Sequence, residues 1–155
     1  MLKGLSLIAL VMAISVDARN LRPNDVSIEA EPYTVLFYFL NMNLQDATID
    51  YTSAARGSVW TQPLPEIVGV ANYTIGQVRG PEDGTEAGGL FHISYSSGDG
   101  FIILGRIGGN QDGCIAQVLG NNNFAVDIRS AYDITDRTLI CTVITTSREI
   151  VQNWI

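Results

Sequence analysis

Apolar and polar residues alternate along most of the chain after Pro32, and β-branched and aromatic residues are frequent in the alternating stretches. No window of helical length keeps the 3.6-residue apolar spacing of an amphipathic helix. Turn-forming residues separate the stretches at intervals of about eight to twelve residues, as in β-sandwiches and β-barrels. The pattern predicts an all-β fold, with strands at 33–40, 47–51, 67–75, 90–96, 101–104, 114–119, 124–128 and 139–145.

Two stretches depart from simple alternation. Residues 33–40 (YTVLFYFL) are almost continuously apolar, which is typical of a strand covered on both faces or nearly so. Residues 76–89 (GQVRGPEDGTEAGG) combine glycine, proline and acids and leave no continuous core face, so we expect a loop or short turns there. Pro63 and Pro65 predict a loop or a sheet edge before the third strand.

Residues 94–106 (SYSSGDGFIILGR) predict a hairpin that ends in an arginine. Residues 98–100 can adopt the positive φ angles of a tight turn, and residues 101–104 then return as the partner strand, alternating between its two faces. We expect Gly105 to allow a bend at the rim of the sheet and Arg106 to emerge there. Its guanidinium could hydrogen-bond a phenolate or methoxy oxygen of a ligand, and the alternative is a surface cation that balances nearby acids.

The first eighteen residues have the layout of a secretory signal peptide. Lys3 precedes an apolar run over residues 5–16, which is too short to span a bilayer, and Ala18 supplies a small residue at the expected cleavage point. The sequence thus predicts a signal peptide at 1–18, a single domain at 19–155 and an extracellular location.

In a secreted chain, a glycosylation sequon and a pair of cysteines can each have a role. Asn72 begins the sequon Asn-Tyr-Thr, which predicts N-glycosylation in a chain that enters the secretory pathway. Cys114 and Cys141 are the only cysteines, and an oxidising compartment permits one disulfide between them. Two separate buried thiols are the alternative.

Composition narrows the classes of partner. Hydrophobic residues make up 46% of the chain, enough for one ordinary core, and Lys+Arg 9 against Asp+Glu 16 leave a net charge of -7. Such a chain is repelled by phosphate backbones and by anionic membranes, so we expect neither nucleic acid nor membrane as partner. His92 is the only histidine, and without a second histidine or a cysteine cluster no zinc site is expected. No G-x-S-x-G element accompanies it for a hydrolase triad.

The order of these segments resembles that of the plant dirigent protein family. The opening strand VLFYFLN (35–41) is similar to the family's TFYFHD, and IGQVRG (75–80) to its VGRAQG. The hairpin over 90–106 and the segment VLGNNNFAVDIRSAY (118–132) resemble two later family motifs. The family's His-Asp pair is replaced by Leu40-Asn41, and asparagines stand in its glycine triad at 121–123.

The resemblance implies an eight-stranded antiparallel β-barrel of the allene-oxide-cyclase and dirigent type, assembled as a homo-oligomer and without metal or organic cofactor. Family members bind phenoxy radicals made by a separate oxidase, a laccase or peroxidase, and direct stereoselective coupling in lignan biosynthesis. The expected function is therefore that of a secreted, apoplastic dirigent-like protein with a small phenolic ligand. It needs no oxidase activity of its own.

A barrel of eight strands is wide enough for one small ligand, which would contact inward-facing side chains. A carboxylate beside a quinone-methide intermediate would act as acid or base, and Asp127 is the catalytic candidate, with a solvated strand residue as the alternative. Tyr38 and Tyr95 could each donate a hydroxyl hydrogen bond or pack as aromatic side chains. The ligand-binding candidates are Tyr38, Asn41, Tyr95, Arg106, Phe124 and Arg129.

Two other functions fit the sequence. Asn41 and the altered glycine turn favour a non-catalytic secreted binder, defence-related or lectin-like, on the same barrel. A membrane-active β toxin is disfavoured, because Trp60 and Trp154 are the only tryptophans and form no cluster of the kind that lipid insertion favours.

Overall fold

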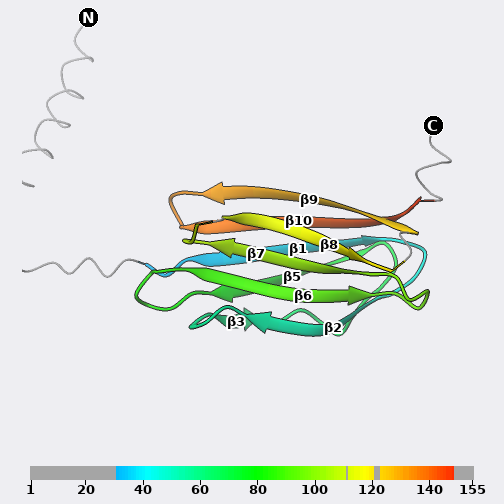
Figure 1. Ribbon diagram of the computed structural model, residues 1–155, viewed down its shortest axis with the longest axis horizontal. Coiled ribbons are helices and arrows are strands. Elements are labelled where there is room, and N and C mark those ends of the chain that lie inside the picture. Colours follow the sequence, from blue (N-terminus) through cyan, green and yellow to red (C-terminus); the bar gives the residue numbers. More distant parts are fainter. Residues whose placement is uncertain (1–30, 111, 121–122, 149–155) are drawn as a thin grey trace, which may run out of the picture.

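The computed structural model describes residues 31–110, 112–120 and 123–148. Its strands form two five-stranded sheets that pack against each other as two layers (Figure 1). The first sheet has the order β3-β5-β1-β10-β9 and the second β4-β2-β6-β7-β8. The strands are β1 (Thr34–Met42), β2 (Ala47–Ala54), β3 (Val59–Gln62), β4 (Ile67–Val68), β5 (Asn72–Arg79), β6 (Ala87–Ser94), β7 (Gly100–Ile107), β8 (Gly113–Leu119), β9 (Phe124–Asp133) and β10 (Thr138–Ser147).

The prediction of an all-β fold is confirmed, but the closed eight-stranded barrel is not found. Ten strands divide between two sheets, and β1 lies in the middle of the first sheet, antiparallel to β5 and parallel to β10. Period-two alternation specifies which face of a strand is buried. It does not specify whether the edge strands of a sheet pair with each other to close a barrel, so a sandwich and a barrel share the same pattern.

Aromatic side chains fill the space between the sheets. Phe37 and Phe39 project inward from β1, and Phe91 and Phe101 meet them from the second sheet, all four almost completely buried. The rings of Phe37 and Phe91 pack edge to face with their centroids 5.2 Å apart. The region expected to form the lumen of a barrel is therefore hydrophobic core.

One disulfide joins the two sheets. Cys114 of β8 and Cys141 of β10 are bonded, which resolves the two alternatives that the sequence left open. Gly105 faces inward beside this bond, where a Cβ atom would lie 2.7 Å from the Cys141 Sγ and 2.8 Å from the ring of Phe37. Gly105 is thus needed for close sheet packing, and the expected bend at the rim is wrong.

The expected loop at 76–89 is also wrong at both of its ends. β5 continues to Arg79, and β6 already begins at Ala87. A Cβ at Gly89 would lie 2.6 Å from the Val78 side chain, and one at Gly76 would lie 2.8 Å from Leu64. The glycines that suggested a loop let neighbouring side chains approach the strand backbone closely.

The expected signal peptide at 1–18 lies outside the described residues. In the part of the chain that the structure describes, no helix combines the length and hydropathy that crossing a bilayer would require.

Replacement of both Cys114 and Cys141 by alanine should lower the free energy of unfolding. The cross-link closes a loop with a sequence separation of 27 residues, so its loss should cost about 3 kcal/mol through the entropy of the unfolded chain. Urea denaturation of parent and variant measures the difference. A loss smaller than about 1 kcal/mol would show that the bond contributes little beyond the packing around it.

Candidate functional site

The residues expected to bind a ligand lie in three separate places and do not share one pocket. Asn41, Tyr95 and Phe124 are buried between the sheets. Tyr38, Asp127 and Arg129 lie on the outer face of the first sheet. Arg106 lies on the outer face of the second sheet.

The buried group forms a polar cluster at one end of the core. The hydroxyl oxygens of Tyr95 and Thr145 are 2.6 Å apart, and the Tyr95 ring packs on Phe124 with centroids 4.5 Å apart. Burial raises the pKa of the Tyr95 hydroxyl, while the side chains of Thr145 and Asn43 act in the opposite direction. These side chains contact one another, so their role in this arrangement is structural.

Asn41 connects this cluster to the surface. Its amide nitrogen donates to the carbonyl oxygens of Gln45 and Val68, both at 2.9 Å, and to that of Gly69 at 3.2 Å. Its amide oxygen accepts from the backbone N–H of Asn43 at 3.2 Å. One buried side chain thereby holds the β1–β2 loop against the segment that follows β4.

That end of the sandwich carries a group of exposed apolar side chains, which we call the apolar tip. Its members come from the end of β1, the β1–β2 loop, β4, the β4–β5 turn and the start of β5. The loop after β1 lies at the right-hand end of the molecule in Figure 1. The tip consists of Met42, Leu44, Ile67, Val70 and Tyr73, exposed by 44% to 69%.

The backbone of the tip is held in place from both sides. Besides the hydrogen bonds of Asn41, the carboxylate of Asp46 accepts a hydrogen bond from the Val70 N–H at 3.2 Å. Ala71 lies in the turn between β4 and β5 with a φ of 52°, a left-handed conformation that non-glycine residues seldom adopt. The exposed side chains are therefore presented by a defined loop structure.

Apolar surface continues from the tip onto the outer face of the first sheet. Tyr38 projects there from β1, 37% exposed, so the expectation that this strand is covered on both faces does not hold among the described residues. A shallow groove of about 300 Å³ is lined by Tyr38, Phe39, Leu40, Tyr73, Thr142 and Ile144. Asp127 and Arg129 lie on the edge strand β9, opposite the groove residues Ile144 and Thr142 of β10, and form an exposed ion pair at 3.0 Å.

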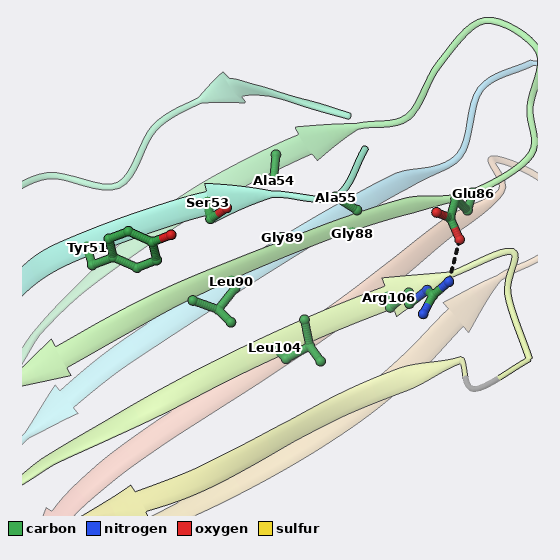
Figure 2. Close-up of a pocket in the computed structure, with 10 residues that line it drawn as sticks. All are labelled: Tyr51, Ser53, Ala54, Ala55, Glu86, Gly88, Gly89, Leu90, Leu104 and Arg106. Carbon is green, nitrogen blue, oxygen red and sulfur yellow. Dashed lines mark hydrogen bonds and ion pairs between the residues drawn. The ribbon is translucent and has the colours of Figure 1, made fainter. Parts of the chain in front are cut away.

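Arg106 lies in a second groove, on the outer face of the second sheet (Figure 2). Its guanidinium donates to the Glu86 carboxylate at 2.5 Å, as expected for the alternative of a surface cation that balances an acid, and its ligand-binding role stays a prediction. The groove has a volume of about 360 Å³. It is lined by Tyr51, Ser53, Ala54, Ala55, Glu86, Gly88, Gly89, Leu90, Leu104 and Arg106.

Sequence reasoning missed both the apolar tip and most of this groove. His92 lies half-buried on the same outer face, with its Nδ1 against the Asp50 carboxylate. No group of three or more histidine, cysteine or acidic residues that could hold a metal ion occurs in the described ranges.

Comparison with solved structures finds the same fold in proteins of very different sequence. The crystal structure of the lipid-binding protein Nakanori matches with a TM-score of 0.59 and 8% sequence identity, over 86% of this chain and 84% of that one. IP-1A from Alcaligenes faecalis matches with a TM-score of 0.50 and 11% identity, over 76% of this chain and 94% of that one. Neither protein-family models nor curated protein sequences give a match.

The Asn41→Ala variant should lower the free energy of unfolding by about 3 kcal/mol, because one buried and two partly buried carbonyl groups lose their donor. Asn43→Ala is the matched control: the amide of this buried side chain holds no backbone carbonyl group of the described residues, so its loss should cost less than about 1 kcal/mol. Chemical denaturation measures both. Equal losses would contradict the clamping role of Asn41.

Proposed function

We propose that this chain is a secreted, non-catalytic lipid-binding protein that docks on a zwitterionic bilayer through the apolar tip. The observation that carries the proposal is the gathering of five large apolar side chains at one end of the sandwich, on loops fixed by Asn41 and Asp46. Exposed apolar side chains gathered at one end of a protein mark protein or membrane contact sites.

The loop structure favours a lipid surface because no reorganisation is needed before contact. Leu44 and Tyr73 are each about two-thirds exposed, so a bilayer could remove most of their surface from water. Each large apolar side chain that leaves water contributes about 1.5 to 3 kcal/mol when burial is complete. Several such side chains acting together suffice for reversible membrane binding.

Charge selects the kind of lipid. Asp46 and Glu66 lie exposed beside the tip, and the exposed Arg148, which follows the end of β10 at the same end of the sandwich, offsets one of these two charges. Acidic groups at the contact oppose binding to anionic lipids. The sequence-based expectation of no membrane partner rested on this charge argument, which does not apply to a bilayer of zwitterionic headgroups.

Two further observations support the proposal. The fold is similar to that of Nakanori, which is a lipid-binding protein. The Cys114–Cys141 disulfide is a cross-link typical of proteins that pass through an oxidising compartment, in agreement with export of the chain.

The dirigent-like function stays a prediction, together with its phenolic ligand, its separate oxidase and its homo-oligomer. Its structural basis was a ligand in the lumen of a barrel, and the interior here is occupied by core side chains such as Phe37 and Phe91. Among the expected ligand-binding residues, Arg106 and Tyr38 each line an open groove, and those two grooves are the places to seek a phenolic ligand.

The Leu44→Ser variant should bind phosphatidylcholine vesicles about tenfold more weakly than the parent, because it removes one of the most exposed apolar side chains of the tip. Vesicle co-sedimentation measures the partitioning. Ile134→Ser is the matched control, since Ile134 is 79% exposed but lies in the β9–β10 turn at the opposite end of the sandwich. Equal weakening in both variants, or no vesicle binding by the parent, would refute docking through the tip.

A glycan on Asn72 should interfere with docking. Asn72 is exposed and lies within the tip, between Val70 and Tyr73 along the chain. A bulky hydrophilic group there would keep the neighbouring apolar side chains from the bilayer. Protein carrying the glycan should bind vesicles more weakly than the same protein after enzymatic deglycosylation. Unchanged binding would place the membrane contact elsewhere.

A further inference from the structure

The groove in Figure 2 is a second candidate binding surface, separate from the apolar tip. It lies across β2, β6 and β7 on the outer face of the second sheet. Its volume of about 360 Å³ falls at the lower end of the range for small-molecule sites. No part of the proposed lipid contact uses it.

The floor of the groove is flat because two neighbouring strands present very small residues. Gly88 faces outward, and a Cβ atom there would lie 3.3 Å from the Ala55 Cβ and 3.6 Å from the Arg106 Cγ. Ala55 continues the floor just after the end of β2, next to Ala54, whose side chain packs against the core. Leu90 and Leu104 add apolar surface along one side, as the close-up shows.

Polar groups gather at the two ends of this floor. At one end the Arg106 guanidinium contacts Glu86, and it is further positioned by Gly109, where a Cβ would lie 3.1 Å from the Arg106 Nε. Tyr51 lies at the other end with its ring more than half exposed, and Ser53 lies between. Donors, acceptors and an aromatic ring thus surround an apolar strip.

The charges at the rim decide which ligand class fits. Arg106 and Glu86 neutralise each other, so the groove offers no net attraction to an anion or a cation. The guanidinium still has N–H donors beyond the one given to Glu86, and the carboxylate has a second oxygen that can accept. A ligand that uses both must carry hydroxyl groups that donate and accept.

We propose that this groove binds a neutral sugar in its pyranose ring form. The C–H face of the ring would lie on the strip formed by Gly88 and Ala55, while adjacent ring hydroxyls would hydrogen-bond Arg106 and Glu86. Tyr51 would cover the exposed edge of the ring through its aromatic face. The inference goes beyond lipid binding and does not depend on it.

The experiment uses the ¹⁵N-labelled protein and the methyl glycosides of glucose, galactose, mannose and N-acetylglucosamine as probes. We expect at least one glycoside to shift the amide signals of residues 88–90 and 104–106 in a saturable way. Arg106→Gln should weaken that binding by at least about tenfold, since a charge-assisted donor is lost. Gly88→Ala should also weaken it, because the added methyl group occupies the floor.

The matched control is Arg129→Gln, which removes an exposed arginine of the same kind, paired with Asp127 on the other sheet. It should bind the glycoside like the parent. Folding of each variant is checked by its thermal unfolding, and binding to phosphatidylcholine vesicles should be equal in Arg106→Gln and parent.

Three outcomes would overturn the proposal. No glycoside shifts these amides; Arg106→Gln and Arg129→Gln bind a glycoside equally; or coniferyl alcohol shifts them while no glycoside does, which would assign the groove to a phenolic ligand. If no glycoside binds but the protein still binds vesicles, the sugar proposal fails and the lipid proposal stands. If a glycoside binds but vesicles do not, the lipid proposal fails and the sugar proposal stands.

Discussion

The close contact of the two sheets around Phe37 is the constraint on which the rest of this structure depends. Its ring packs on Phe91, and glycines at positions 89 and 105 leave the space that a side chain would otherwise take from it. The Cys114–Cys141 bond ties the sheets together at the same place. Because the interior is filled in this way, the surfaces available for ligands lie on the outside of the sandwich.

The outside surfaces differ in what they can recognise. The tip presents apolar side chains with acidic neighbours, whereas the groove at Gly88 combines a flat apolar strip with a neutral pair of charges. Asn41 connects the first of these to the core, since its buried amide binds carbonyl groups of two surface segments. The buried side chain of Asn41 thus fixes the backbone conformation of the tip.

Much of the fold could be predicted from the sequence, because burial of alternate residues follows directly from the pleat of a strand. The alternation of residues 101–104 is observed as predicted, with Phe101 and Ile103 buried. The four-residue strand β3 and the glycine-containing start of β6 were not predicted. The strand β3 is too short to show a period. The glycines at the start of β6 are required because side chains of other strands approach them closely, which the local sequence does not show.

The candidate site was harder to predict than the fold. Tyr95 and Asn41 were selected as ligand-binding candidates, but the sequence gives no sign that they would hydrogen-bond to each other within the core. Leu44 and Val70 stand in loops, where an apolar residue has no periodic pattern to mark it as exposed. Only the pairing of the β1–β2 loop with the β4–β5 turn brings them together.

Paramagnetic broadening by a nitroxide-labelled phosphatidylcholine, measured residue by residue on the ¹⁵N-labelled protein bound to bicelles, tests docking through the tip most directly. The account predicts broadening confined to the amides of residues 42–45 and 67–73, with the signal of Ile134 at the opposite end unaffected. Broadening that is uniform, or strongest at Ile134, would contradict it.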